Sequence, residues 1–181
     1  LQRLVQQRLT ALELLRELVG PSVVARGAGR VVLAAQLLAD GLELAAKQAA
    51  KQTYFQSVHV AKEVLTDMRI GRAVNLRRVK RAVQSIVDQV LNNETFMLGM
   101  TTLRDYDQYT FTHCVNVCIL SVVLGQKLGL SKIQLYDLGL GALFHDIGKV
   151  RVDAKIINKP SGLTDHEWHE MQQHPTEGLL A

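Results

Sequence analysis

Apolar residues recur every three or four positions along most of the chain, which is the spacing of one face of an α-helix. This spacing predicts a helix over residues 1–19, ended by Gly20 and Pro21, and a longer helix over residues 31–67. Residues 22–30 between them are predicted as a loop. No run shows convincingly the alternating pattern of a half-buried strand, so we expect an all-α fold.

The clearest amphipathic pattern follows Asn75, whose side chain can accept hydrogen bonds from the first turn of a helix. Apolar residues repeat at the helical spacing after it, which predicts one buried face. The residues of this face are Val79, Val83, Ile86, Val87, Val90 and Leu91.

Another helix is predicted over residues 109–128, with Gly129 in the left-handed conformation that often ends a helix. Its high apolar content indicates that it is largely buried. The residues expected in the core are Val115, Val117, Ile119, Leu120, Val122, Val123 and Leu124.

The next helix is expected to begin after Ser131 and to run to about His145. Its interior contains Gly139 and Gly141, each of which costs roughly 1 kcal/mol relative to alanine. We expect both glycines where another backbone approaches closely. Residues 148–162 are predicted as a loop.

Thr164 and Glu167 have the spacing of a capping box, which predicts that a last helix starts there. This helix is expected to contain Trp168, Met171 and His174. We expect Trp168 and Met171 to lie in the core.

Composition and charge are those of an ordinary globular protein. The 181 residues are 48% apolar and 21% charged, which excludes disorder and predicts one domain, or one plus a piece. The net charge of +4 is too small to indicate binding to a nucleic-acid polymer. No apolar run reaches the roughly 18 residues of a membrane span, and no signal peptide is evident. We therefore expect a cytoplasmic protein.

Six basic residues lie close together in the sequence with no acidic residue between them. Two interpretations stay open: an ordinary solvated face, or a surface that binds an anion or a partner. The residues are Arg69, Arg72, Arg77, Arg78, Lys80 and Arg81.

The two cysteines, Cys114 and Cys118, are four residues apart on one predicted helix. Their spacing matches neither a redox motif nor a zinc site. We expect reduced thiols that pack in the core.

Candidate chemistry rests on His113, the adjacent pair His145 and Asp146, and His174. Imidazoles with a carboxylate form a nitrogen and oxygen ligand set that suits iron, manganese or zinc. An aspartate can also bridge two ions about 3.5–4 Å apart, which can clamp the attacking and leaving oxygens of a phosphodiester. Each residue alone has an ordinary structural explanation. Together they indicate a shared metal, which removes the cost of burying unpartnered titratable groups.

The sequence around these residues resembles a known family. Residues 143–149, LFHDIGK, are similar to the signature of the HD metal-dependent phosphohydrolases. Three more segments resemble the HD-GYP subfamily: YTFTHCVNV over 109–117, KPSGLTDHE over 159–167 and HPTEG over 174–178. The resemblance covers roughly residues 54–181.

This resemblance implies an all-helical bundle of the HD-domain type that hydrolyses cyclic di-GMP, or a related cyclic dinucleotide, at a two- or three-metal site. The implied metal ligands are His113, His145, Asp146 and His174, with Asp146 bridging.

Lys149 is the implied phosphate contact, and a solvated loop cation is the alternative. Asn116 lies one turn from His113. It either contacts a metal ligand or the substrate, or it is a polar residue of the core.

The sequence departs from the subfamily pattern in two ways. Tyr109 stands where members with a third metal tend to carry glutamate, which favours two divalent ions, iron or manganese. The chain also ends at Ala181, before the further ligands and the Gly-Tyr-Pro loop of the family. We therefore expect an HD-GYP domain that is incomplete at its C-terminus and, alone, turns over little substrate.

Residues 53–181 are assigned to this domain, and residues 1–52 to an accessory, linker or dimerisation region that could form a homodimer through its helices. A cyclic dinucleotide phosphodiesterase is the leading prediction. The alternatives are another HD-type nucleotide phosphohydrolase and a catalytically incomplete signalling or binding module.

Overall fold

The computed structural model describes residues 21–103 and 109–180, with side chains from residue 33 onward. No strand occurs in these ranges, and the all-α prediction is confirmed. None of the described helices is long and apolar enough to cross a membrane. The predicted helix over residues 1–19 lies outside the described residues.

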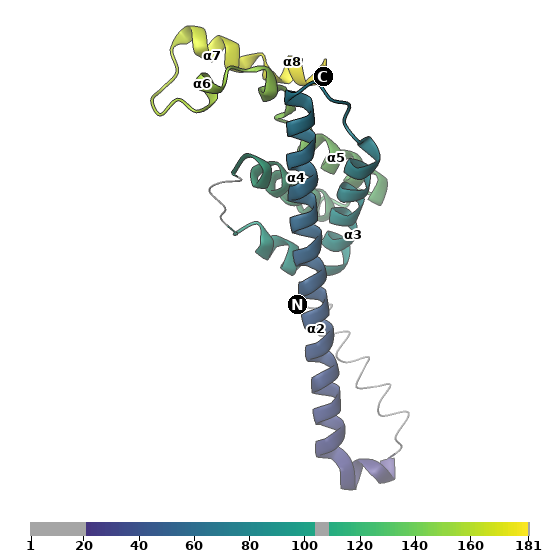
Figure 1. The fold of residues 1–181 in the computed structure, drawn as a ribbon. Helices are drawn as coiled ribbons and strands as arrows, with labels where there is room; N and C mark the ends of the chain where they lie inside the picture. The colour runs from purple at the N-terminus through teal and green to yellow at the C-terminus, as the bar shows by residue number, and fades with distance from the viewer. Residues whose placement is uncertain (1–20, 104–108, 181) are drawn as a thin grey trace. The chain divides into compact units, whose positions relative to one another are not determined.

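Helix α2 (Pro21–Arg69) is the longest element in Figure 1. The predicted loop over residues 22–30 is wrong, because these residues are helical. A proline fits the first turn of a helix, where its missing N–H removes no internal hydrogen bond. Pro21 therefore opens α2, and no loop follows it.

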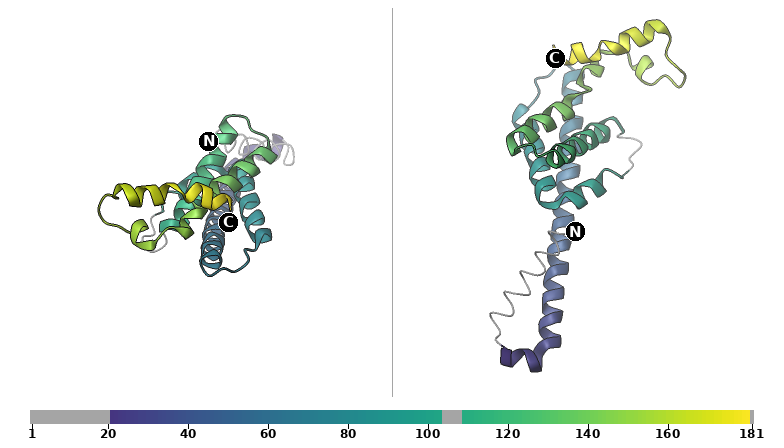
Figure 2. Two further views of the ribbon diagram at one scale, coloured as in Figure 1. Left: turned by 90° about the horizontal axis from the view of Figure 1, so that it is seen from above. Right: turned by 180° about the vertical axis from the view of Figure 1, so that it is seen from behind.

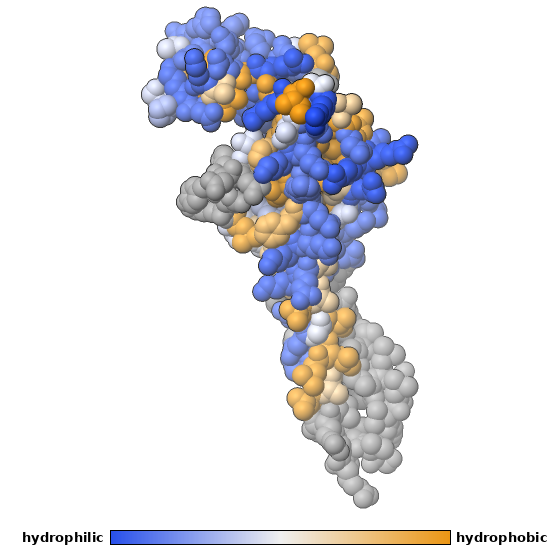
Figure 3. Space-filling view, in the orientation of Figure 1, coloured by the Kyte–Doolittle hydropathy of each residue, from blue (hydrophilic) through white to orange (hydrophobic). Residues whose placement is uncertain are grey.

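The chain divides into two compact units, Leu1–Gln48 and Ala49–Ala181. The described part of the first unit is the N-terminal part of α2. Figure 3 shows hydrophobic residues on the surface of this part of the helix. Its exposed leucines are Leu33, Leu37, Leu38, Leu42 and Leu44. The assignment of an accessory role to residues 1–52 stays a prediction.

The second unit is built around α3 (Leu76–Met100), α4 (Tyr109–Lys127) and α5 (Lys132–Phe144), which contact one another pairwise. Figures 1 and 2 show these helices gathered beside the C-terminal part of α2. Buried apolar side chains from all four helices form one core. The largest of them include Tyr54, Ile86, Ile119 and Leu135.

Helix α3 begins as predicted. The Asn75 side chain accepts a hydrogen bond from the backbone N–H of Arg78 at 3.3 Å. The predicted apolar face is buried, with Leu91 half-buried at its edge. Asn93 has a non-helical conformation, with φ −138° and ψ 45°, and marks a kink in α3.

Helix α4 also ends where predicted: Gly129 has φ +78°, and the N–H of Leu130 donates to the carbonyl of Gly125 at 3.0 Å. The prediction that Leu120 and Leu124 are buried is wrong, because they are 50% and 61% exposed. The helix is apolar on most sides, so its periodicity could not distinguish the face toward the core. The other predicted core residues are buried or half-buried: Val115, Val117, Ile119, Val122 and Val123.

Helix α5 is capped by Ser131 as predicted. A Cβ on Gly139 would lie 3.0 Å from Val122 and 3.1 Å from Val83, so this glycine allows α5 to pack closely against the side chains of α4 and α3. The expectation of a close backbone approach is wrong for both glycines, because the atoms near Gly139 belong to side chains and a Cβ on Gly141 would meet nothing within 4 Å.

Four short helices follow α5: η1 (Ile147–Arg151), α6 (Ala154–Ile157), α7 (Asp165–Gln172) and α8 (His174–Leu179). The predicted loop over residues 148–162 is therefore partly helical. Figures 1 and 2 show α6 and α7 extending away from the α3–α5 bundle. The prediction that Trp168 lies in the core is wrong, since it is 54% exposed, and Met171 is half-buried.

The predicted last helix is in fact two. The Thr164–Glu167 capping box is present and opens α7. The chain then breaks at Gln173, and His174 starts α8 with Pro175 in its first turn. Since proline cannot donate within a continuing helix, Pro175 favours a new start at this point.

Candidate metal centre

Three histidines from separate segments surround Asp146, which lies between α5 and η1. The distance from His113 Nε2 to Asp146 Oδ2 is 3.8 Å, and that from His145 Nε2 to the same oxygen is 3.3 Å. His174 Nε2 lies 3.5 Å from the other oxygen, Oδ1. The Asp146 side chain is only 13% exposed. Its two oxygens therefore face different imidazoles, of which His113 and His145 are 39% and 35% exposed.

Backbone carbonyls fix the orientation of two of these rings. His145 Nδ1 lies 2.8 Å from the carbonyl oxygen of Ala142, and His174 Nδ1 lies 2.7 Å from that of Met171. A carbonyl oxygen can only accept, so each Nδ1 is the donor and each Nε2 is turned toward Asp146. Hydrogen bonds of this kind hold metal-binding histidines in the correct tautomer.

The arrangement fits a bound cation. In a neutral ring whose Nδ1 carries the proton, Nε2 presents a lone pair. A lone pair that faces a carboxylate oxygen at 3.3–3.5 Å is repelled unless a proton or a metal ion lies between them. Three imidazoles and one carboxylate form a ligand set typical of transition metals.

A close backbone contact between η1 and α8 places His174 at the cluster. A Cβ on Gly148 would lie 1.8 Å from the His174 carbonyl oxygen and 2.5 Å from the backbone nitrogen of Gly178. Only glycine permits this approach. Gly178 is similarly close, since a Cβ there would lie 3.2 Å from the backbone nitrogen of Gly148.

His113 is held by α4, whose buried residues on either side of it, Thr112 and Cys114, anchor the start of the helix. The ring centroids of His113 and His145 are 5.4 Å apart. One ligand atom from each of His113, His145 and Asp146 can be chosen so that all lie within 4.8 Å of one another. These three residues could hold a metal ion.

Lys149 donates a hydrogen bond to Asp146 Oδ2 at 2.6 Å. Burial raises the pKa of Asp146, but the hydrogen bond from Lys149, the ammonium charge of Lys149 and the nearby imidazoles of His145 and His174 lower it by more, so the net pKa is below its ordinary value. The carboxylate is therefore ionised and able to bind a cation at neutral pH.

Residues 110–180, which include all of these groups, match the family described as HD domain. This segment of the chain is therefore similar to the HD domain family. The resemblance seen in the LFHDIGK motif is thereby confirmed. No solved structure matches the chain significantly.

Several curated proteins that the chain resembles are phosphodiesterases by name. The chain is 37% identical over 112 residues to a cyclic di-GMP phosphodiesterase of Pseudomonas aeruginosa, covering 62% of this chain and 27% of the relative. It is 34% identical over 81 residues to a cyclic di-GMP phosphodiesterase of Thermotoga maritima, covering 44% and 22%. A 3′3′-cGAMP-specific phosphodiesterase of Vibrio cholerae is 31% identical over 91 residues, covering 50% and 21%. The chain thus spans about a quarter of the length of these relatives.

Asn116 of the HD domain makes hydrogen bonds within the bundle. Its Oδ1 accepts from the Tyr54 hydroxyl at 3.1 Å, and its Nδ2 donates to the carbonyl of Thr101 at 3.3 Å. These bonds connect α4 to α2 and to the end of α3. They favour a positioning role for Asn116 over the substrate contact predicted for it.

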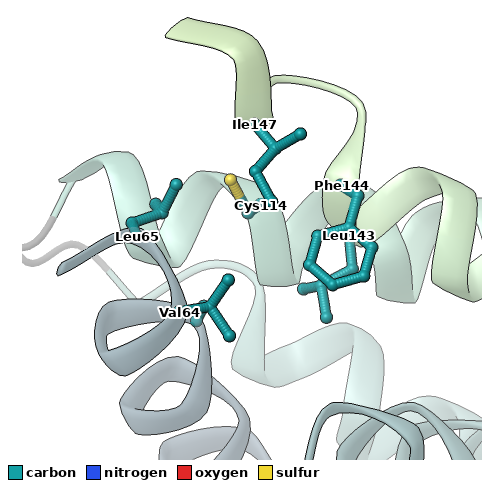
Figure 4. A pocket seen from close by; sticks show the side chains of 7 residues that line it. Val64, Leu65, Cys114, Leu143, Phe144 and Ile147 are labelled. Atoms are coloured by element: carbon teal, nitrogen blue, oxygen red, sulfur yellow. The ribbon is translucent and has the colours of Figure 1, made fainter. Parts of the chain in front are cut away.

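A small apolar pocket lies between α2 and the segments that carry the candidate ligands (Figure 4). Val64 and Leu65 of α2 line it together with Cys114 and Ile147, which follow His113 and Asp146 directly in the sequence. Burial raises the pKa of Cys114 to about 11, and the nearby Asp146 charge acts in the same direction. The thiol is therefore protonated and packs as an apolar group.

Sequence reasoning missed the groups that position the HD domain ligands. The carbonyls of Ala142 and Met171 each lie three residues before a histidine, but a backbone oxygen leaves no signal in the sequence. The two glycines that permit the backbone contact, Gly148 and Gly178, could have been found from the sequence, because each follows a predicted ligand by a few residues.

Proposed function

We propose that the protein is a metal-dependent phosphodiesterase that hydrolyses cyclic dinucleotides, with cyclic di-GMP as the principal substrate. The observation that carries the proposal is the convergence of His113, His145 and His174 on the two oxygens of Asp146. The named activities of the relatives, which act on cyclic di-GMP and 3′3′-cGAMP, support this substrate class.

The proposed cofactor is a pair of iron or manganese ions. His113, His145 and Oδ2 of Asp146 lie on one side of the carboxylate, and His174 faces Oδ1, so Asp146 can bridge two ions. Bound ions would activate a water molecule at neutral pH and neutralise charge on the phosphate. Lys149 neutralises charge that develops on a nonbridging phosphate oxygen. Water attacks phosphorus, the bond to the ribose 3′ oxygen breaks, and that oxygen takes up a proton to give a linear dinucleotide.

The test is hydrolysis of cyclic di-GMP by the full-length protein, purified without chelators and followed by anion-exchange chromatography. His145→Ala should reduce turnover by more than about a hundredfold, since the loss of even an outer-shell partner costs 10–100-fold. His166→Ala is the matched control, because His166 is exposed on α7 and should leave turnover unchanged.

Two outcomes would contradict the proposal. Hydrolysis of other nucleotides without cyclic dinucleotides would indicate a different HD phosphohydrolase. Binding of cyclic di-GMP without turnover would indicate a signalling or binding module.

We also propose that two copies associate through the N-terminal part of α2. Leu33, Leu37 and Leu44 fall on one helical stripe and are exposed. Sedimentation velocity should show a dimer for the wild-type protein and a monomer for the double variant Leu37→Glu, Leu44→Glu. The variant Gln48→Glu, at an exposed polar position, should remain a dimer. A monomeric wild-type protein would contradict the proposal.

A further inference from the structure

The last turns of α2 pack against the segments that carry the metal ligands. Leu65 lines the apolar pocket with Cys114 and Ile147 (Figure 4), and these residues directly follow His113 and Asp146. This side of α2 therefore contacts the segments that carry the candidate metal ligands.

Arg69 is the last residue of α2 and follows Leu65 by four positions. Residues four apart on a helix lie one turn apart on the same side, so Arg69 extends the side of α2 that Leu65 presents to the pocket. Its side chain is exposed, and it has no ion-pair or hydrogen-bond partner among the described residues. Arg69 is therefore an exposed guanidinium group one helical turn beyond the lining of the pocket.

Two other arginines of the basic cluster make contacts elsewhere. Arg78 donates to Glu63 at 2.8 Å. Arg81 donates from Nε to the carbonyl of Arg77 and lines a separate groove with Ser57. Arg81 is thus a matched comparison for Arg69: it is exposed and has no carboxylate partner among the described residues, but it is on another surface.

A cyclic dinucleotide has two phosphodiester groups in one ring. The metal centre and Lys149 account for the group that is cleaved, and the second negative charge needs another partner. We propose that Arg69 binds this second, uncleaved phosphate, an inference that rests on the proposed function. The planar guanidinium group suits the role because it can donate two parallel hydrogen bonds to phosphate oxygens.

The test compares two substrates of the metal-loaded, full-length protein: cyclic di-GMP, with two phosphates, and bis(p-nitrophenyl) phosphate, with one. Arg69→Gln should lower kcat/KM for cyclic di-GMP about tenfold or more relative to its effect on bis(p-nitrophenyl) phosphate, mainly through KM. It should weaken binding of a hydrolysis-resistant phosphorothioate analogue of cyclic di-GMP by the same factor. Arg81→Gln should change neither substrate.

Each contrary result overturns the inference in a recognisable way. An equal loss on both substrates would place Arg69 in the support of the metal centre, and no loss on either would show that it makes no contact. An equal effect of Arg81→Gln would show a general field of positive charge. A wild-type protein that cleaves only bis(p-nitrophenyl) phosphate would refute the proposed substrate, and with it the second phosphate that Arg69 is assigned to bind.

Discussion

Asp146 has different neighbours at each of its two carboxylate oxygens. Oδ2 faces His113, His145 and the ammonium group of Lys149, whereas Oδ1 faces His174. An amide of the same shape has only one oxygen and no charge, so it cannot bind cations at both oxygen positions.

Asp146→Asn should therefore abolish stoichiometric metal binding, with affinity reduced by at least about a hundredfold. Elemental analysis of the protein purified without chelators measures the effect. Asp137→Asn, at an exposed position on α5, is the control and should keep the wild-type metal content. Full metal occupancy in Asp146→Asn would show that the ligand set is wrong.

Sequence alone predicted the candidate ligands because their chemistry belongs to side chains. His145 and Asp146 are adjacent in the sequence, and His113 and His174 stand in recognisable motifs. What it could not predict was which nitrogen of each ring faces the carboxylate, since that depends on carbonyls in the preceding turn.

At the scale of elements, the contact between η1 and α8 depends on a missing side chain. Gly148→Ala would place a Cβ against the backbone of His174, which cannot move without shifting α8. The variant should keep its helical content by circular dichroism but lose most of its metal, as measured by elemental analysis.

Gly141→Ala is the matched control, because its Cβ would meet nothing within 4 Å. It should keep the metal and gain roughly 1 kcal/mol of stability from the higher helix propensity of alanine. Wild-type metal content in Gly148→Ala would show that the backbone contact does not position His174.

Helix α7 depends on Glu167. Its carboxylate accepts hydrogen bonds from Lys159 and from the backbone N–H and hydroxyl of Thr164, which together lower the pKa of Glu167 to about 2. Because the folded-state pKa is below the ordinary value of 4.5, the stabilisation is complete above 4.5 and is lost as the pH falls toward 2.

Glu167→Gln should accordingly speed amide exchange in residues 165–172 relative to wild type at pH 6, and by a smaller factor at pH 3. Glu170→Gln removes a charge from the same helix, but its carboxylate contacts His166, so it serves as the control. The same factor at both pH values for Glu167→Gln would contradict a role for the ionised carboxylate.

Hydrophobic periodicity predicted α3 well, because a helix with one apolar face has only one way to be buried. It failed for Leu120 and Leu124 of α4, where apolar residues occur on most sides. It also failed at Gln173, where the break between α7 and α8 depends on where Pro175 falls in the turn.

At the scale of the whole molecule, the candidate metal ligands come from parts of the second unit that differ greatly in packing. His113 belongs to α4 and His145 caps the C-terminus of α5, and these two helices share a buried core. His174 belongs to α8, and neither α7 nor α8 contains a buried residue. The core therefore does little to hold these two helices in place.

The contact between Gly148 and Gly178 brings His174 of α8 close to Asp146. An ion held by both residues would therefore hold α7 and α8, which have no buried residues, against the bundle. Chelation of the metal should raise hydrogen–deuterium exchange in residues 165–179 by tenfold or more, while residues 79–90 of α3 stay protected. Equal loosening of both segments would show that the ion braces the entire bundle. With the expected result, the exchange rate of residues 165–179 would show whether the site holds its metal.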